Sequence, residues 1–154
     1  MGYRSFREDR IFAVRWVGSP TAEDVSRMTK DVGAARAAAG APLYGVWLIS
    51  AEDPIAPTDI RDAIVRRWPE IMTSCATLHI VLVGPSVKAS LFRSVLRTMI
   101  VVARVKNVTI VESIDEVLHP LREVMPSQTA FHQLKRRLTT ELGDGSMPPD
   151  VAAS

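Results

Sequence analysis

Cysteine is almost absent from this sequence, and its scarcity excludes several kinds of site. Cys75 is the only cysteine in 154 residues. One cysteine cannot form an intramolecular disulfide, and a zinc site built from cysteines needs more than one. The three histidines, at positions 79, 119 and 132, are scattered, and no two have the i,i+4 spacing of a helical metal site. We therefore expect no metal and no other cofactor.

Long apolar runs and a strong net charge are also missing. The longest apolar stretch, around Met99–Ala103, is too short to span a membrane. The first ten residues are polar and charged, unlike a secretory signal. We therefore expect a cytoplasmic protein. The formal net charge of +2 gives no reason to expect nucleic-acid binding, which calls for basic residues clustered on one face.

What is present is an average globular composition with alternating strand and helix patterns. Hydrophobic residues make up 47% of the chain, enough for a core in a domain of ordinary size. Apolar runs rich in β-formers predict strands, and the first two of these strands are expected to form a hairpin. These strands lie at 3–7, 11–17, 43–49, 78–83 and 108–111. The intervening helices give the order β-β-α-β-α-β-α-β-α. This order predicts an α/β fold with a mostly parallel sheet of four to five strands and an antiparallel N-terminal edge hairpin.

Local signals place the helix ends. Ser19-Pro20 is typical of an N-cap followed by proline in the first turn, and Gly40 predicts the end of that helix. The next helix begins near Thr58, and Pro69 predicts a kink or break late in it.

Two further helix starts are predicted downstream. Ser86 is expected to cap a long helix through about Arg104. Ser113 and Glu116 have the spacing of a capping box, in which each side chain bonds the other residue's backbone.

The C-terminal part divides into a helix and a tail. Phe131, Leu134, Leu138 and Leu142 form a narrow apolar stripe that must dock on the domain or on a partner. We expect a domain over 1–125, an amphipathic helix over 126–142 and a disordered tail over 143–154.

The element order resembles the STAS fold of bacterial anti-sigma-factor antagonists and of the cytoplasmic domains of sulfate transporters. The resemblance covers about residues 3 to 125. It rests on strands at 11–18, 44–50, 78–84 and 108–111 and on a glycine before the first helix. It implies a non-catalytic protein-interaction module in bacterial signal transduction, whose partner is a regulatory kinase or another signalling protein.

The resemblance also implies a candidate phosphoacceptor. In regulatory STAS members the second helix begins with Asp-Ser-x-Gly, and phosphorylation of the serine releases the partner. That motif falls on residues 57–60 here, where Thr58 takes the hydroxyl position. Pro57 replaces the aspartate and Ile60 the glycine. An ordinary helix cap is the alternative interpretation of Thr58.

A partner-binding face is predicted beside Thr58. Three arginines of the third helix share one narrow sector at about 100° per residue, with two aliphatic residues flanking them. The predicted contact residues are Arg61, Arg93, Arg97, Ile100, Val101 and Arg104. Such a face suits an acidic partner, and a solvated surface is the alternative.

Two other functions are weighed against the interaction module. A lipid or small-ligand domain of the same architecture would need a cavity lined by residues such as Trp47, Trp68, Phe92 and Met99, which could equally be core. An enzyme would use the loops at the carboxyl ends of the strands. Those loops offer Ser50, Glu52, Asp53, Ser86, Lys88 and Glu112, with no histidine or cysteine among them. We therefore expect no catalytic activity.

Overall fold

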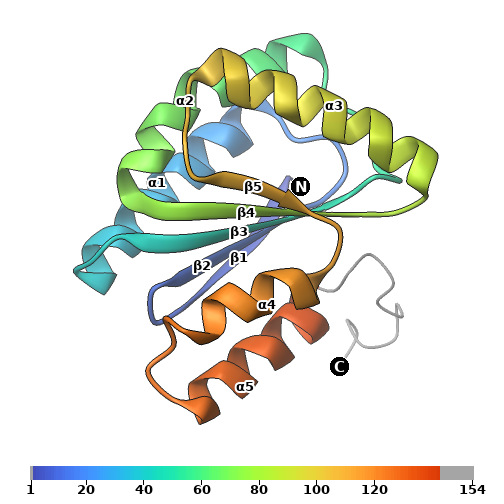
Figure 1. Cartoon of the computed structure of the whole chain (residues 1–154). Helices are drawn as coiled ribbons and strands as arrows, with labels where there is room; N and C mark the ends of the chain where they lie inside the picture. Colours follow the sequence, from blue (N-terminus) through green and yellow to red (C-terminus); the bar gives the residue numbers. More distant parts are fainter. Residues whose placement is uncertain (1, 143–154) are drawn as a thin grey trace.

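A computed structural model, which describes residues 2–142, shows a five-stranded sheet with helices on both faces (Figure 1). The strands are β1 (Tyr3–Glu8), β2 (Ile11–Trp16), β3 (Leu43–Ser50), β4 (Cys75–Val83) and β5 (Val108–Val111). They lie side by side in chain order. β1 runs antiparallel to β2, and the other neighbours pair in parallel. The predicted α/β fold with an antiparallel edge hairpin is confirmed.

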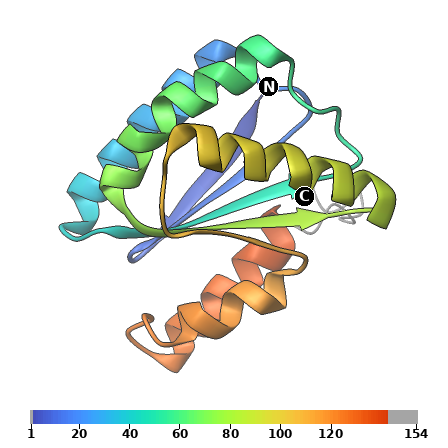
Figure 2. The same ribbon diagram turned by 45° about the horizontal axis from the view of Figure 1, so that its top comes forward.

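The helices divide between the two faces of the sheet (Figures 1 and 2). One face carries α1 (Ala22–Ala39), α2 (Thr58–Ser74) and α3 (Ser86–Ala103). The other carries α4 (Ile114–Arg122), α5 (Gln128–Arg137) and a π-helical segment, η1 (Leu138–Leu142). Each parallel strand is added next to its predecessor by a right-handed crossover, so the three connecting helices fall on one face.

Successive side chains of a strand point to opposite faces of the sheet, so each strand contributes to a hydrophobic core on each face. In β2, Val14 and Trp16 join the cluster under α1–α3, whereas Ile11 and Ala13 join the cluster under α4 and α5. β3 and β4 are covered on both faces in the same way, which explains their nearly continuous apolar sequences.

The start of α1 differs from the prediction. The N-cap is Thr21, not Ser19, and the helix begins at Ala22. Thr21 and Asp24 form a capping box, in which the Thr21 Oγ1 accepts the Asp24 N–H and the Asp24 carboxylate accepts the Thr21 N–H. Ser19 has no such partner three residues on, since Ala22 stands there. The predicted stop at Gly40 is confirmed by its left-handed conformation, φ 69°.

α2 is continuous across Pro69, so the helix does not break there. Trp68 and Ile71, on either side of the proline, are almost fully buried. Burial of two large apolar side chains is worth about 1.5–3 kcal/mol each, which offsets a proline cost of about 3 kcal/mol. β4 then begins at Cys75 rather than Leu78, directly after the helix.

The later helix ends follow the prediction in part. Ser86 is the first residue of α3, but Pro85 is its N-cap and no side chain caps it. The helix ends at Ala103, because Arg104 adopts the left-handed conformation with φ 56°. The capping box of Ser113 and Glu116 is confirmed at the start of α4.

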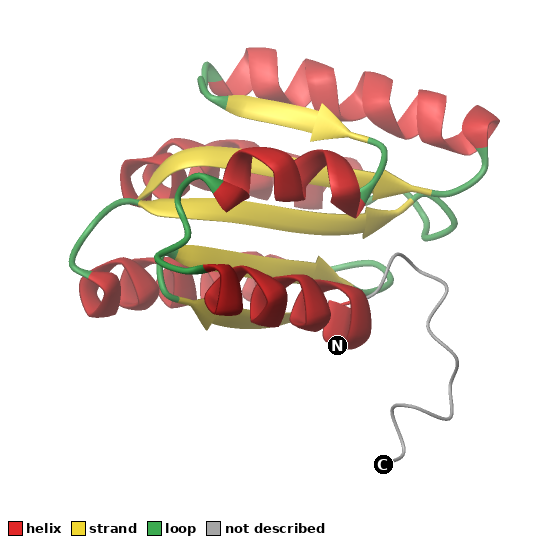
Figure 3. Ribbon diagram, turned by 60° about the horizontal axis from the view of Figure 1, so that its bottom comes forward, coloured by secondary structure: helices red, strands yellow, loops and turns green. Residues whose placement is uncertain are grey.

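The C-terminal helix docks on the domain rather than being left for a partner (Figure 3). Leu134 and Leu138 are fully buried in the cluster that includes Phe6 of β1. Arg137 donates to the Glu8 Oε2 at 2.9 Å and lies 4.1 Å from the centre of the Phe6 ring. The tail predicted over 143–154 lies outside the described residues.

Candidate functional site

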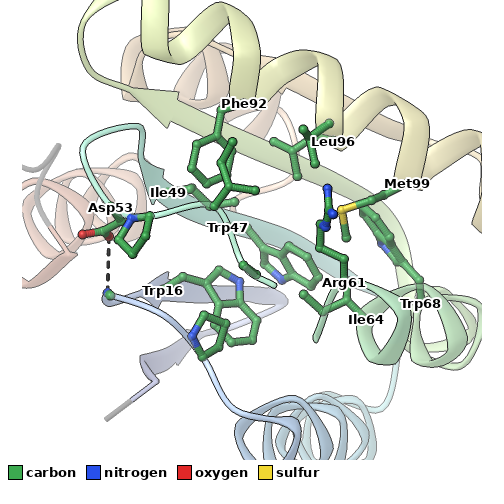
Figure 4. Close-up of a pocket in the computed structure, with 16 residues that line it drawn as sticks. Trp16, Trp47, Ile49, Asp53, Arg61, Ile64, Trp68, Phe92, Leu96 and Met99 are labelled. Carbon is green, nitrogen blue, oxygen red and sulfur yellow. Dashed lines mark hydrogen bonds between the residues drawn. The ribbon is translucent and has the colours of Figure 1, made fainter. Parts of the chain in front are cut away.

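An apolar cavity of about 60 Å³ lies between the sheet and helices α2 and α3 (Figure 4). Trp16, the last residue of β2, and Trp47 of β3 form its floor on the sheet. Trp68 of α2 and Phe92 and Met99 of α3 are among the helical residues that line it. The cavity reaches the surface at the loops that follow β2 and β3. It is therefore near the carboxyl ends of parallel strands, where open α/β sheets usually bind ligands.

The aromatic wall of the cavity contains all three tryptophans of the chain. The ring centres of Trp16 and Trp47 are 5.7 Å apart, and those of Trp47 and Trp68 are 5.5 Å apart in a stacked arrangement. Tyr3 extends the row, with its ring centre 5.7 Å from that of Trp16. Strand alternation places Trp16 and Trp47 on the same face of adjacent strands, so that they meet.

One polar atom in this wall is unsatisfied. Trp68 is fully buried, and its Nε1–H has no hydrogen-bond acceptor in the part of the chain that the structure describes. A buried donor without an acceptor costs about 1–3 kcal/mol. Buried indole N–H groups usually find a partner, so an unpaired one in the wall of a cavity is unusual.

Two charged residues line the cavity, one on each side in Figure 4. Asp53, in the loop after β3, accepts the N–H of Gly18 at 3.3 Å and so ties the two mouth loops together. Arg61, on the first turn of α2, donates to the Thr58 Oγ1 at 2.9 Å. No ion pair of Arg61 with a carboxylate is found among residues 2–142.

The predicted phosphoacceptor Thr58 is exposed at the start of α2. It is the first helical residue, and Pro57 is the N-cap without a side-chain cap. The alternative interpretation of Thr58 as an ordinary cap is therefore wrong. Its hydroxyl instead accepts the bond from Arg61.

The other predicted contact residues lie on a different flank of α3. Arg93 pairs with Glu112, just after β5, at 2.9 Å. Thr58 and Arg61 instead share a shallow hollow with the α2-facing side of α3, at Val95 and Thr98 among others. The structure thus brings Thr58 and Arg61 together but separates them from the arginines of α3.

The predicted contact residues on this flank of α3 differ in how far they are exposed to solvent. Ile100 is half-buried against the core, whereas Val101 is 74% exposed. Arg97 is exposed, and Arg104 forms the C-cap of α3.

The sequence predicted some of the residues that line the cavity but not others. Trp47, Trp68, Phe92 and Met99, suggested as cavity residues, all line the cavity, and all four also belong to the hydrophobic core. Trp16 was missed. A tryptophan at the carboxyl end of a strand is the signal that could have found it.

The groups with catalytic potential are dispersed. Burial raises the pKa of the Cys75 thiol to about 11 and lowers the pKa of His79. The Ser50 Oγ accepts the N–H of Glu52 at 3.2 Å, an ordinary turn bond. Among the described residues, no group of three or more His, Cys, Asp or Glu side chains is placed to hold a metal ion.

Comparison with models of protein families, with curated proteins and with solved structures finds no match. None of the helices in residues 2–142 combines the length and the apolar character needed to cross a bilayer.

Proposed function

We propose that this chain is a STAS-like, non-catalytic binding domain whose cavity receives the apolar part of a small ligand. The observation that carries the proposal is the convergence of all three tryptophans around one cavity at the carboxyl ends of β2 and β3. Small-ligand sites are typically concave, apolar and aromatic, with few polar groups, as this one is.

The size of the cavity limits the ligand. An empty apolar cavity of about 60 Å³ costs roughly 1.4 kcal/mol at about 24 cal/mol per Å³, so filling it is favourable. A cavity of about 150 Å³ accommodates benzene. The smaller space suits a narrow unbranched alkyl chain that continues outward through the mouth.

The intrinsic fluorescence of the protein tests this directly, because every tryptophan lines the cavity. Titration with hexanol should give a saturable change in emission. The variant Ala56→Leu, at the mouth, should weaken binding about tenfold, since the added carbons displace about two methylene groups worth about 0.8 kcal/mol each.

Ala37→Leu, at an exposed position of α1, is the matched control and should bind hexanol as the unmodified chain does. An emission that does not saturate with hexanol, or an Ala56→Leu variant with unchanged affinity, would overturn the proposal.

A second function, binding of an acidic signalling protein such as a kinase, is favoured by the outer face of α3. Val87, Leu91 and Val101 are 82%, 61% and 74% exposed there. Exposed apolar residues gathered on one element are typical of interaction sites. Arg97, on the same helix, has no ion pair within the described stretch and supplies a charge for an acidic partner.

The test of this second function compares variants in affinity purification from the native host. Arg97→Glu should lose a partner that Arg66→Glu, on the exposed side of α2, retains, and the domain should stay folded. Phosphate on Thr58 in the same sample would support the phosphoswitch. Equal recovery of every partner by both variants would exclude the Arg97 face as the contact surface.

A further inference from the structure

Arg61 carries a charge at the cavity that no carboxylate of residues 2–142 neutralises. Its side chain is half-buried, lines the cavity, and makes its hydrogen bond to a neutral hydroxyl, the Thr58 Oγ1. Partial burial of a cation costs free energy unless an opposite charge compensates it. Other arginines of the chain have such a compensation, as Arg93 does with Glu112 and Arg67 with Glu70.

The start of α2 adds to the positive potential at the same place. The first N–H groups of a helix lack intrahelical acceptors, and no side chain caps them here. The positive end of the helix dipole favours an anion within the first turn, where Arg61 also lies.

Three carboxylates belong to this region and must be considered: Asp53, Asp59 and Asp62, the last of which lines the hollow shared by Thr58 and Arg61. Asp53 lines the cavity but is held by the N–H of Gly18, on the side away from Arg61 in Figure 4. Asp59 is exposed in the first turn of α2. None of the three forms an ion pair with Arg61, so the guanidinium is available to a ligand.

We infer that the ligand is an amphipathic monocarboxylate: its alkyl chain enters the tryptophan-lined cavity and its carboxylate binds Arg61 at the start of α2. The inference rests on the proposed ligand-binding function and names the class of ligand. One guanidinium matches one carboxylate, which it can bind with two parallel hydrogen bonds. Binding is non-covalent.

The experiment compares hexanoate with its neutral isostere hexanamide, by tryptophan fluorescence of the full chain at neutral pH. Hexanoate should bind about tenfold more tightly, a difference of about 1.4 kcal/mol. Arg61→Gln should remove this preference and leave the hexanamide affinity within about twofold. Arg66→Gln, on the same helix but away from the cavity, should keep the preference.

The outcomes separate this inference from the function on which it rests. If hexanamide and hexanol bind but hexanoate binds no better, or if Arg61→Gln keeps the preference, the inference is overturned and the cavity remains a neutral binding site. If none of the three compounds binds, the ligand-binding function itself is overturned. Near-ultraviolet circular dichroism of Arg61→Gln establishes that the aromatic row is intact.

Discussion

Asp24 is the charged side chain most closely built into the fold. It is buried, and its Oδ2 accepts both the N–H and the hydroxyl of Thr21, at 2.8 and 2.9 Å. The N–H of Thr21 is the main cause that lowers the pKa of the Asp24 carboxyl, and the Thr21 hydroxyl and Arg27 add to it against the opposing effect of burial. The carboxylate of Asp24 is therefore more stable in the folded state than in the unfolded chain.

This pKa shift gives a prediction for stability against pH. Folding lowers the pKa of Asp24, so its charged form stabilises the fold fully at pH values above the pKa of the unfolded chain, which is near 4. This stabilisation is lost as the pH falls through the pKa of the folded state. Asp24→Asn should lower the free energy of unfolding by about 1 kcal/mol at neutral pH, and the difference should narrow below about pH 4.

Urea denaturation at several pH values measures this difference. Glu23→Gln is the control, since Glu23 is exposed and pairs with Arg27 across one helical turn, a contact worth at most about 0.5 kcal/mol. The lowered pKa of Asp24 would be contradicted if the free energies of unfolding of Asp24→Asn and the unmodified chain differed by a constant amount down to strongly acidic pH.

Helix and strand ends show what the sequence could and could not predict. Gly40, Ser113 and β5 were predicted correctly because each carries a strong local signal: a left-handed glycine, a capping box and a short run of β-formers. The start of α1 was misplaced because two hydroxyl residues, Ser19 and Thr21, compete, and only the residue three positions on decides between them.

Other ends depend on tertiary contacts and leave no local signal. Cys75 fits the apolar stripe of α2 and also the first position of β4, where it pairs with Leu43. The continuity of α2 across Pro69 depends on how deeply Trp68 is buried. The cavity residues could be named from the sequence, but whether four apolar side chains fill a space or leave one open depends on packing between elements.

The C-terminal helix provides a prediction that involves both faces of the sheet. Leu138 is fully buried below the sheet, whereas all the tryptophans lie above it. Leu138→Ala should lower the free energy of unfolding by about 2–5 kcal/mol, and Lys135→Ala, which is exposed, by less than about 0.5.

The same experiment tests whether the two cores unfold together. They share the strands β2, β3 and β4, so the urea transitions followed by tryptophan fluorescence and by far-ultraviolet circular dichroism should shift by the same amount. A Leu138→Ala variant whose tryptophan transition is unchanged would mean that α5 and η1 detach independently.

The molecule as a whole is assembled in chain order, and its last described elements return to its first. Each strand from β2 onward is added beside the one made just before it. Arg137 and Leu138 then pack on the hairpin of β1 and β2. The ion pair of Arg137 with Glu8 joins residues that are 129 positions apart in the sequence.

That return has a consequence for biosynthesis. The sheet and its upper helices can form on the ribosome as each unit emerges, because their contacts are mostly between neighbours in sequence. Until η1 has left the exit tunnel, however, the apolar underside of β1 to β4 is covered only in part, by α4. The nascent chain therefore exposes apolar surface until η1 has emerged, and that interval is when a chaperone would engage it.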